Sequence, residues 1–99
     1  MKTWLLLVAA TLFLIVNVSL AGDYFNGKTV YELNCMSCHG SHGQSMDPSV
    51  PNFADGDALF RPDQDLFEQV RRGSGIMPAF QGVLSEAEIR DVITYIRSL

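Results

Sequence analysis

The sequence predicts a small all-α protein with long loops between its helices. Three stretches within residues 22–99 place apolar residues at the spacing of one helix face. Segments rich in Gly, Ser and Pro separate these stretches. The chain has 99 residues without an internal repeat or a low-complexity tract, so we expect one small domain.

The N-terminal segment has the layout of a secretory signal peptide. Lys2 gives it a positive start, residues 4–16 are apolar but for one threonine, and residues 19–21 (Ser-Leu-Ala) place small residues at the cleavage-rule positions. We therefore expect residues 1–21 to be removed on export to the periplasm, which leaves residues 22–99 as the mature domain. The alternative is an uncleaved membrane anchor, because apolar residues continue almost to the end of the segment.

The most informative motif is Cys-Met-Ser-Cys-His at residues 35–39, directly after the first expected helix at residues 25–33. Its spacing is C-x-x-C-H, by which haem is attached covalently to protein. Two thiols at this spacing can each form a thioether at one edge of the porphyrin, and the following histidine then lies under the ring as a ligand to the iron. The sequence therefore predicts one covalent haem c on Cys35 and Cys38, with His39 as an iron ligand.

Two other interpretations of the motif are open. An exported chain can join Cys35 and Cys38 in a disulfide or redox pair, although no strand pattern of the thioredoxin-like kind precedes them. A zinc site would need Cys35, Cys38, His39 and His42 as ligands within eight residues. Zinc-ligand pairs are usually separated by about a dozen residues or more, so the zinc site is weaker than haem attachment. The disulfide or redox pair is weaker as well, because it leaves the adjoining histidine unexplained.

Two further helices are expected after the motif. Residues 40–51 have no period and are rich in Gly, Ser and Pro, which predicts a loop. Residues 63–72 begin with acidic residues, end with arginines and are followed by a glycine, as helices often are. Residues 85–98 begin with an S-x-x-E capping box. The expected inward positions of the three helices are Phe25, Val30, Tyr31 and Leu33, then Leu66, Phe67 and Val70, then Ile89, Val92, Ile93 and Ile96.

Met77 is the candidate for the second axial ligand of the iron. It lies between the last two expected helices, and Pro78 biases it toward an extended backbone. Gly73 and Gly75 let this loop approach a flat ring closely. A thioether held on such a loop can bind haem iron opposite a histidine, so the sequence predicts His39 and Met77 as the axial pair.

The balance of charge limits the partners of the protein. The chain has 11 acidic and 7 basic residues, and loss of residues 1–21 would remove only Lys2 from this count. An acidic surface argues against nucleic acid and against anionic membrane surfaces. It favours a redox protein partner with a basic or mainly apolar docking patch, unless the charge serves solubility alone. We expect a monomer that meets a membrane only if the signal stays uncleaved.

With these motifs in place, residues 22–99 resemble the class I monohaem cytochromes c, in particular the short bacterial forms. The resemblance implies three to four helices wrapped around one covalent haem, with Gly27 and Tyr31 of the first helix crossing Val92 and Tyr95 of the last. It also implies that the carbonyl oxygen of a proline accepts a hydrogen bond from the second ring nitrogen of the axial histidine. The candidates for that proline are Pro51 and, more weakly, Pro48.

One departure from the family concerns the haem propionates. The tryptophan that often bonds a propionate is missing, because the single Trp of the chain, Trp4, lies in the expected signal. The candidates to replace it are Arg61, Arg71 and Arg72. Positions expected to form the haem wall or the core are Phe53, Phe60, Phe67, Ile76 and Phe80.

The expected function is electron transfer between a donor and an acceptor protein that are exported or membrane-bound. The protein is expected not to be an enzyme, because iron with both axial positions filled makes and breaks no substrate bond. One alternative is a haem-based sensor or weak peroxidase, in which Met77 does not bind the iron and the sixth position is open. Another alternative is a dedicated cytochrome subunit of one oxidoreductase.

Overall fold

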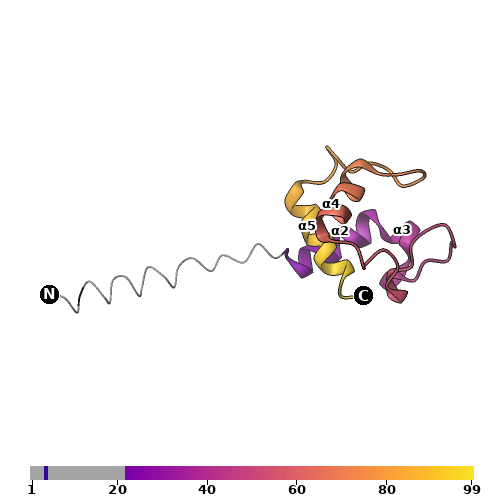
Figure 1. Ribbon diagram of the computed structural model, residues 1–99, viewed down its shortest axis with the longest axis horizontal. Helices are drawn as coiled ribbons and strands as arrows, with labels where there is room; N and C mark the ends of the chain where they lie inside the picture. The colour runs from indigo at the N-terminus through magenta and orange to yellow at the C-terminus, as the bar shows by residue number, and fades with distance from the viewer. Residues whose placement is uncertain (1–3, 5–21) are drawn as a thin grey trace.

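The computed structural model describes Trp4 and residues 22–99, and the expected signal peptide otherwise lies outside the described residues. Residues 22–99 form helices joined by loops, without a strand (Figure 1). No helix among the described residues is long and apolar enough to span a membrane. The elements are α2 (Tyr24–Asn34), α3 (Met36–His39), η1 (Ser41–Gly43), η2 (Phe53–Asp55), α4 (Asp63–Arg72) and α5 (Glu86–Ile96), where η is a 3₁₀ turn. The predicted all-α fold is confirmed.

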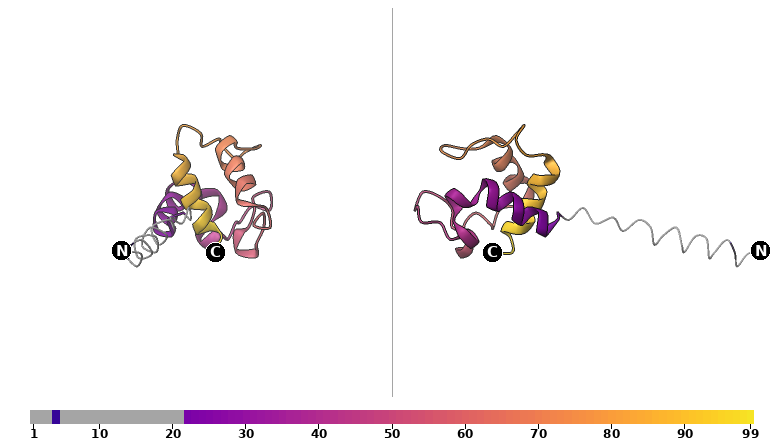
Figure 2. Two further views of the ribbon diagram at one scale, coloured as in Figure 1. Left: turned by 60° about the vertical axis from the view of Figure 1, so that its left-hand side comes forward. Right: turned by 180° about the vertical axis from the view of Figure 1, so that it is seen from behind.

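The centre of the domain is the crossing of α2 and α5, which Figures 1 and 2 show from three directions. A Cβ atom added to Gly27 would lie 2.0 Å from the carbonyl oxygen of Asp91, so the two backbones nearly touch there. Beside this contact the rings of Tyr31 and Tyr95 pack with centroids 5.2 Å apart. Val92 is fully buried on the same side of α5. The four crossing positions expected from the sequence are therefore confirmed.

Hydrogen bonds fasten the first turn of α2 to α5. The carboxylate of Asp91 accepts from the backbone N–H of Asp23 at 2.7 Å and from the side-chain amide of Asn26 at 2.6 Å. Asp23 in turn caps α2, because its side chain accepts from the backbone N–H of Asn26. The start of α2 is thus fixed against the middle of α5.

The buried face of α2 differs from the predicted one. Gly27, Val30 and Tyr31 are buried, whereas Phe25 and Leu33 are each 78% exposed. Val30 and Tyr31 follow Gly27 by three and four residues and therefore lie on the same side of the helix, whereas Phe25 and Leu33 project from the opposite side. The prediction chose Phe25 and Leu33 for their apolar character and is wrong for both, since a glycine sets the inward face.

The later helices begin and end close to the predicted residues. α4 spans the predicted residues 63–72, and Gly73 ends it with a φ of +69°. The predicted capping box begins α5, with Ser85 and Glu88 each accepting a hydrogen bond from the other's backbone N–H. The predicted loop at residues 40–51 contains the short turn η1, in which His42 adopts a left-handed conformation.

Replacing Gly27 with Ala should destabilise the domain by about 3 kcal/mol, because the new methyl group overlaps the Asp91 carbonyl and the helices must separate. Denaturant unfolding of the haem-loaded protein measures this loss. Thr29→Ala changes an exposed position of the same helix and should leave the free energy of unfolding within about 0.5 kcal/mol. Equal stability of the two variants would contradict the close crossing.

Candidate haem-binding site

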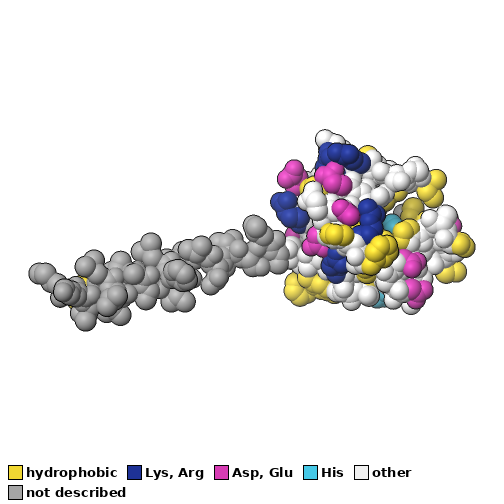
Figure 3. Space-filling model, in the orientation of Figure 1, with side chains coloured by type: hydrophobic (Ala, Val, Ile, Leu, Met, Phe, Trp, Pro, Cys, Tyr) yellow, Lys and Arg dark blue, Asp and Glu magenta, His cyan; other side chains and the backbone are white. Residues whose placement is uncertain are grey.

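A cleft of about 390 Å³ lies between the segment that follows α2 and the loop that follows α4. Cys35, Cys38 and His39 line it from the first segment, and Met77 lines it from the second. Pro51 lies on its wall as well. In the space-filling view, hydrophobic side chains gather around a hollow on the right-hand side of the molecule (Figure 3). The structure therefore brings all five sequence-predicted site residues to one cavity.

The backbone around the motif forms one continuous turn of helix. The N–H of Cys35 donates to Tyr31 at the end of α2, and the N–H of His39 donates to Cys35 at 2.9 Å. Gly40 then reverses the chain with a φ of +84°, and a Cβ atom there would lie 1.9 Å from a backbone oxygen. The hydroxyl of Tyr31 donates to the carbonyl of Gly40 at 2.6 Å. The α2–α5 crossing thereby positions the motif.

The imidazole of His39 is held on two sides. Its Nδ1–H donates to the carbonyl oxygen of Pro51 at 3.2 Å, and its ring stacks on Phe53 with centroids 4.4 Å apart. Pro48, the weaker sequence candidate, is not among the residues that line the cleft. Burial lowers the pKa of His39, and the hydrogen bond to Pro51 partly opposes this shift. The neutral imidazole is favoured, and its Nε2 lone pair is left for a metal.

The side chains of the two motif cysteines line the cleft. Cys35 is half-buried and Cys38 is exposed, and their sulfur atoms are not joined. Burial, with Cys38 adding to it, raises the pKa of Cys35 to about 11. Within the described part of the chain, no group of three or more His, Cys, Asp and Glu side chains is arranged to hold a metal ion, so the zinc interpretation gains no support.

Met77 is held by the tight loop that the glycines allow. Its backbone exchanges two hydrogen bonds with Ser74, at 2.9 and 3.0 Å. Gly73 lies so close to this turn that an added Cβ would meet the Met77 carbonyl oxygen at 2.5 Å. The thioether sulfur of Met77 accepts a hydrogen bond from the side-chain amide of Gln69 at 3.7 Å. Gln69 was not predicted, because a lone glutamine beside an inward-facing valine carries no distinguishing signal in the sequence.

The expected haem-wall residues lie in different places. Phe80 is buried and, with the exposed Ile76, lines the cleft, while Phe53 is buried behind His39. Phe67 lines a different cavity, between α4 and α5. Phe60 is 87% exposed, so its expected role is wrong. Phe60 lies in a hydrogen-bonded turn, in which the N–H of Arg61 donates to the carbonyl oxygen of Ala58 at 3.2 Å, and the turn directs its side chain into solvent.

The residues of the cleft match the chemistry of a covalent haem. Two thiols stand at one end, and an imidazole nitrogen and a thioether are available to an iron ion. Val50, Ile76 and Phe80 supply apolar walls. No carboxylate is among the described residues that line the cleft. A flat apolar ring with iron at its centre suits such a cavity, and a hydrated cation does not.

Comparisons with known proteins agree with this geometry. The family model described as cytochrome c oxidase, cbb3-type, subunit III matches residues 22–96. Cytochrome c6 of Synechocystis is 31% identical, over 86% of this chain and 72% of its own length. The solved structure of cytochrome c6 from the diatom Phaeodactylum tricornutum superposes with a TM-score of 0.63 at 33% identity, covering 78% of this chain and 93% of that one. Subunit CcoP of Azospirillum brasilense is 34% identical, but the match spans only 27% of CcoP.

The helical fold and the cleft define a small haem protein of the c type. The chain belongs to the family of that model, among the class I monohaem cytochromes c. It carries one covalently bound haem c and transfers electrons, and it is not an enzyme.

Replacing Gln69 with Leu should lower the reduction potential of the haem. The positive N–H end of the amide dipole faces the Met77 sulfur, and its loss removes a contact that disfavours the ferric state. Gln64→Leu is the control, because Gln64 is an exposed residue of the same helix that lines the other cavity. Optical redox titration measures both variants. A potential equal to that of the parent protein in Gln69→Leu would rule out this contact as a determinant.

Proposed function

We propose that Cys35 and Cys38 form the two thioethers of the haem and that His39 and Met77 are the axial ligands of its iron. The observation that carries the proposal is the shared cleft, in which Pro51 occupies Nδ1 of the histidine and leaves Nε2 for the metal. A disulfide or a redox pair formed by Cys35 and Cys38 would give no role to the thioether of Met77 or to the apolar walls of the cleft.

The side chains around the cleft would hold the iron in one coordination through both oxidation states. Pro51 and Phe53 fix the plane of the imidazole, and the hydrogen bond from His39 to Pro51 raises its basicity as a ligand. The Ser74–Met77 turn keeps the thioether in place. The bound haem supplies the ferrous–ferric couple. A histidine–methionine pair in an apolar cleft favours the ferrous state and raises the potential.

The redox partners we propose are a donor and an acceptor protein that meet the molecule transiently at the cleft. Ile76 lines the cleft and is 79% exposed, so it offers an apolar contact beside the cofactor. Electron-transfer contacts of this kind are small. A dedicated cytochrome subunit is the second candidate, favoured by the description of the matching family model. If the protein is a carrier that meets its partners transiently, we propose that it is a monomer.

We also propose that residues 1–21 are a cleaved signal and that the domain acts in the periplasm. The packing of Gly22 supports this boundary. A Cβ atom at residue 22 would lie 2.5 Å from the Arg90 carbonyl oxygen and 2.5 Å from the Thr94 hydroxyl oxygen. The folded domain therefore makes close contacts from the first residue after the proposed cleavage site.

The mass of the protein from an export-competent host should equal that of residues 22–99 plus one haem. The mass is measured after denaturation, so that only a covalently attached haem is retained. The Cys35→Ala, Cys38→Ala double variant, processed in the same host, should have the mass of residues 22–99 alone. A product that keeps residues 1–21 would support the anchor, and haem retained by the double variant would exclude the proposed thioethers.

Replacing Met77 with Ala should open the sixth position of the iron. The variant should keep its covalent haem, bind carbon monoxide readily when reduced, and have a lower potential because the thioether is lost and water enters. Met46→Ala is the matched control, since Met46 is 96% exposed. Flash photolysis and redox titration give the two readings. A parent protein that binds carbon monoxide rapidly, unchanged in Met77→Ala, would favour the sensor or weak peroxidase.

A further inference from the structure

Arg61 is the charged side chain of the haem cleft. It is partly buried, and no Asp, Glu, Lys or other Arg is among the described residues that line the cleft. The chain as a whole has more acidic than basic residues, yet none of the lining residues is acidic. The sign of the charge in the cleft is thus opposite to that of the protein.

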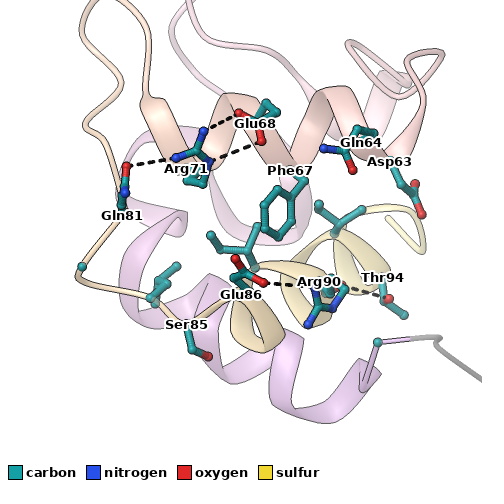
Figure 4. Close-up of a pocket in the computed structure, with 15 residues that line it drawn as sticks. Asp63, Gln64, Phe67, Glu68, Arg71, Gln81, Ser85, Glu86, Arg90 and Thr94 are labelled. Carbon is teal, nitrogen blue, oxygen red and sulfur yellow. Dashed lines mark hydrogen bonds and ion pairs between the residues drawn. The ribbon is translucent and has the colours of Figure 1, made fainter.

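Every other Lys and Arg side chain in the described part of the chain has a carboxylate within 4.0 Å. The pairs are Lys28–Glu32, Arg71–Glu68, Arg72–Glu68, Arg90–Glu86 and Arg97–Asp63. Figure 4 shows two of them, at Arg71 and Arg90, in the cavity between α4 and α5. Arg61 makes no such pair within residues 22–99. A cation taken partly out of water without a counter-charge is costly, so its place in the cleft calls for an anion.

The backbone of Arg61 is held by the end of α5. Arg97 donates to the carbonyl oxygens of Leu59 and Arg61 at 2.8 and 2.7 Å, and its Nε donates to Asp63 at 2.6 Å. These three hydrogen bonds hold residues 59–63 against the end of α5. Less freedom is then lost when the Arg61 guanidinium binds a ligand, because its backbone is already in place.

We propose that Arg61 binds a propionate carboxylate of the haem at the rim of the cleft. The inference rests on the proposed function, since it requires the haem in this cleft. Haem supplies the negative charge that the cleft residues lack, and a guanidinium can bind a carboxylate through two parallel hydrogen bonds. The other two candidates from the sequence, Arg71 and Arg72, are both paired with Glu68, and neither lines the cleft.

The test is the reduction potential of the haem-loaded protein as a function of pH in Arg61→Gln, Arg61→Lys and Arg72→Gln. Arg72→Gln removes the same charge from a side chain that is 71% exposed and outside the cleft. Without the guanidinium the propionate protonates at higher pH, and more readily beside ferrous than ferric iron. The potential of Arg61→Gln should therefore fall with rising pH across the mildly acidic to neutral range. At the upper end it should lie below that of the parent.

Arg61→Lys should give a smaller dependence of the same sign, and Arg72→Gln should follow the parent. Arg61→Gln and Arg72→Gln with the same profile would overturn the proposal. If Arg61→Gln does not assemble with haem, Arg61→Lys provides the test. The proposal is then overturned if the potential of Arg61→Lys depends on pH in the same way as that of the parent. A parent protein that lacks covalent haem, or that lacks the far-red band of sulfur-ligated ferric haem, would instead refute the proposed function.

Discussion

The contact between Gly27 of α2 and the Asp91 carbonyl of α5 is the constraint on which the rest of the molecule depends. It allows the two helices to approach until Tyr31, Tyr95 and Val92 are buried between them. A domain of this size has few residues with which to build a core, so close packing at one crossing carries much of its stability. The largest fully buried side chains, at Tyr31, Ile89 and Val92, lie on these two helices.

The haem cleft is built outward from that crossing on both sides. At the end of α2, Cys35 continues the helix, and the Tyr31 hydroxyl holds the turn at Gly40 that follows the motif. At the end of α5, Arg97 holds the segment that contains Arg61. The two helices that form the core therefore also position the C-x-x-C-H motif and Arg61. A change in their crossing angle would be felt at both.

The sequence predicted the parts of the site that depend on covalent spacing. The motif at residues 35–39 and the Gly-flanked Met77 can each be recognised from a few neighbouring residues. The capping box at Ser85 is equally local. Side chains whose role depends on a distant neighbour could not be found in this way. Gln69 becomes notable only beside the Met77 sulfur, and Arg61 differs from Arg71 because it lines the haem cleft while Arg71 is paired with Glu68 elsewhere.

The first and last helices of the domain meet, and this has a consequence for the order of folding. Gly27 and Asp91 are far apart in the sequence, so the intervening chain must close into a long loop before the crossing forms. Contacts of such long range make folding slow. In a chain that still lacks Glu86–Ile96, the inward face of α2 has no partner. We therefore expect the haem to be attached at Cys35 and Cys38 before α5 packs on α2 and completes the domain.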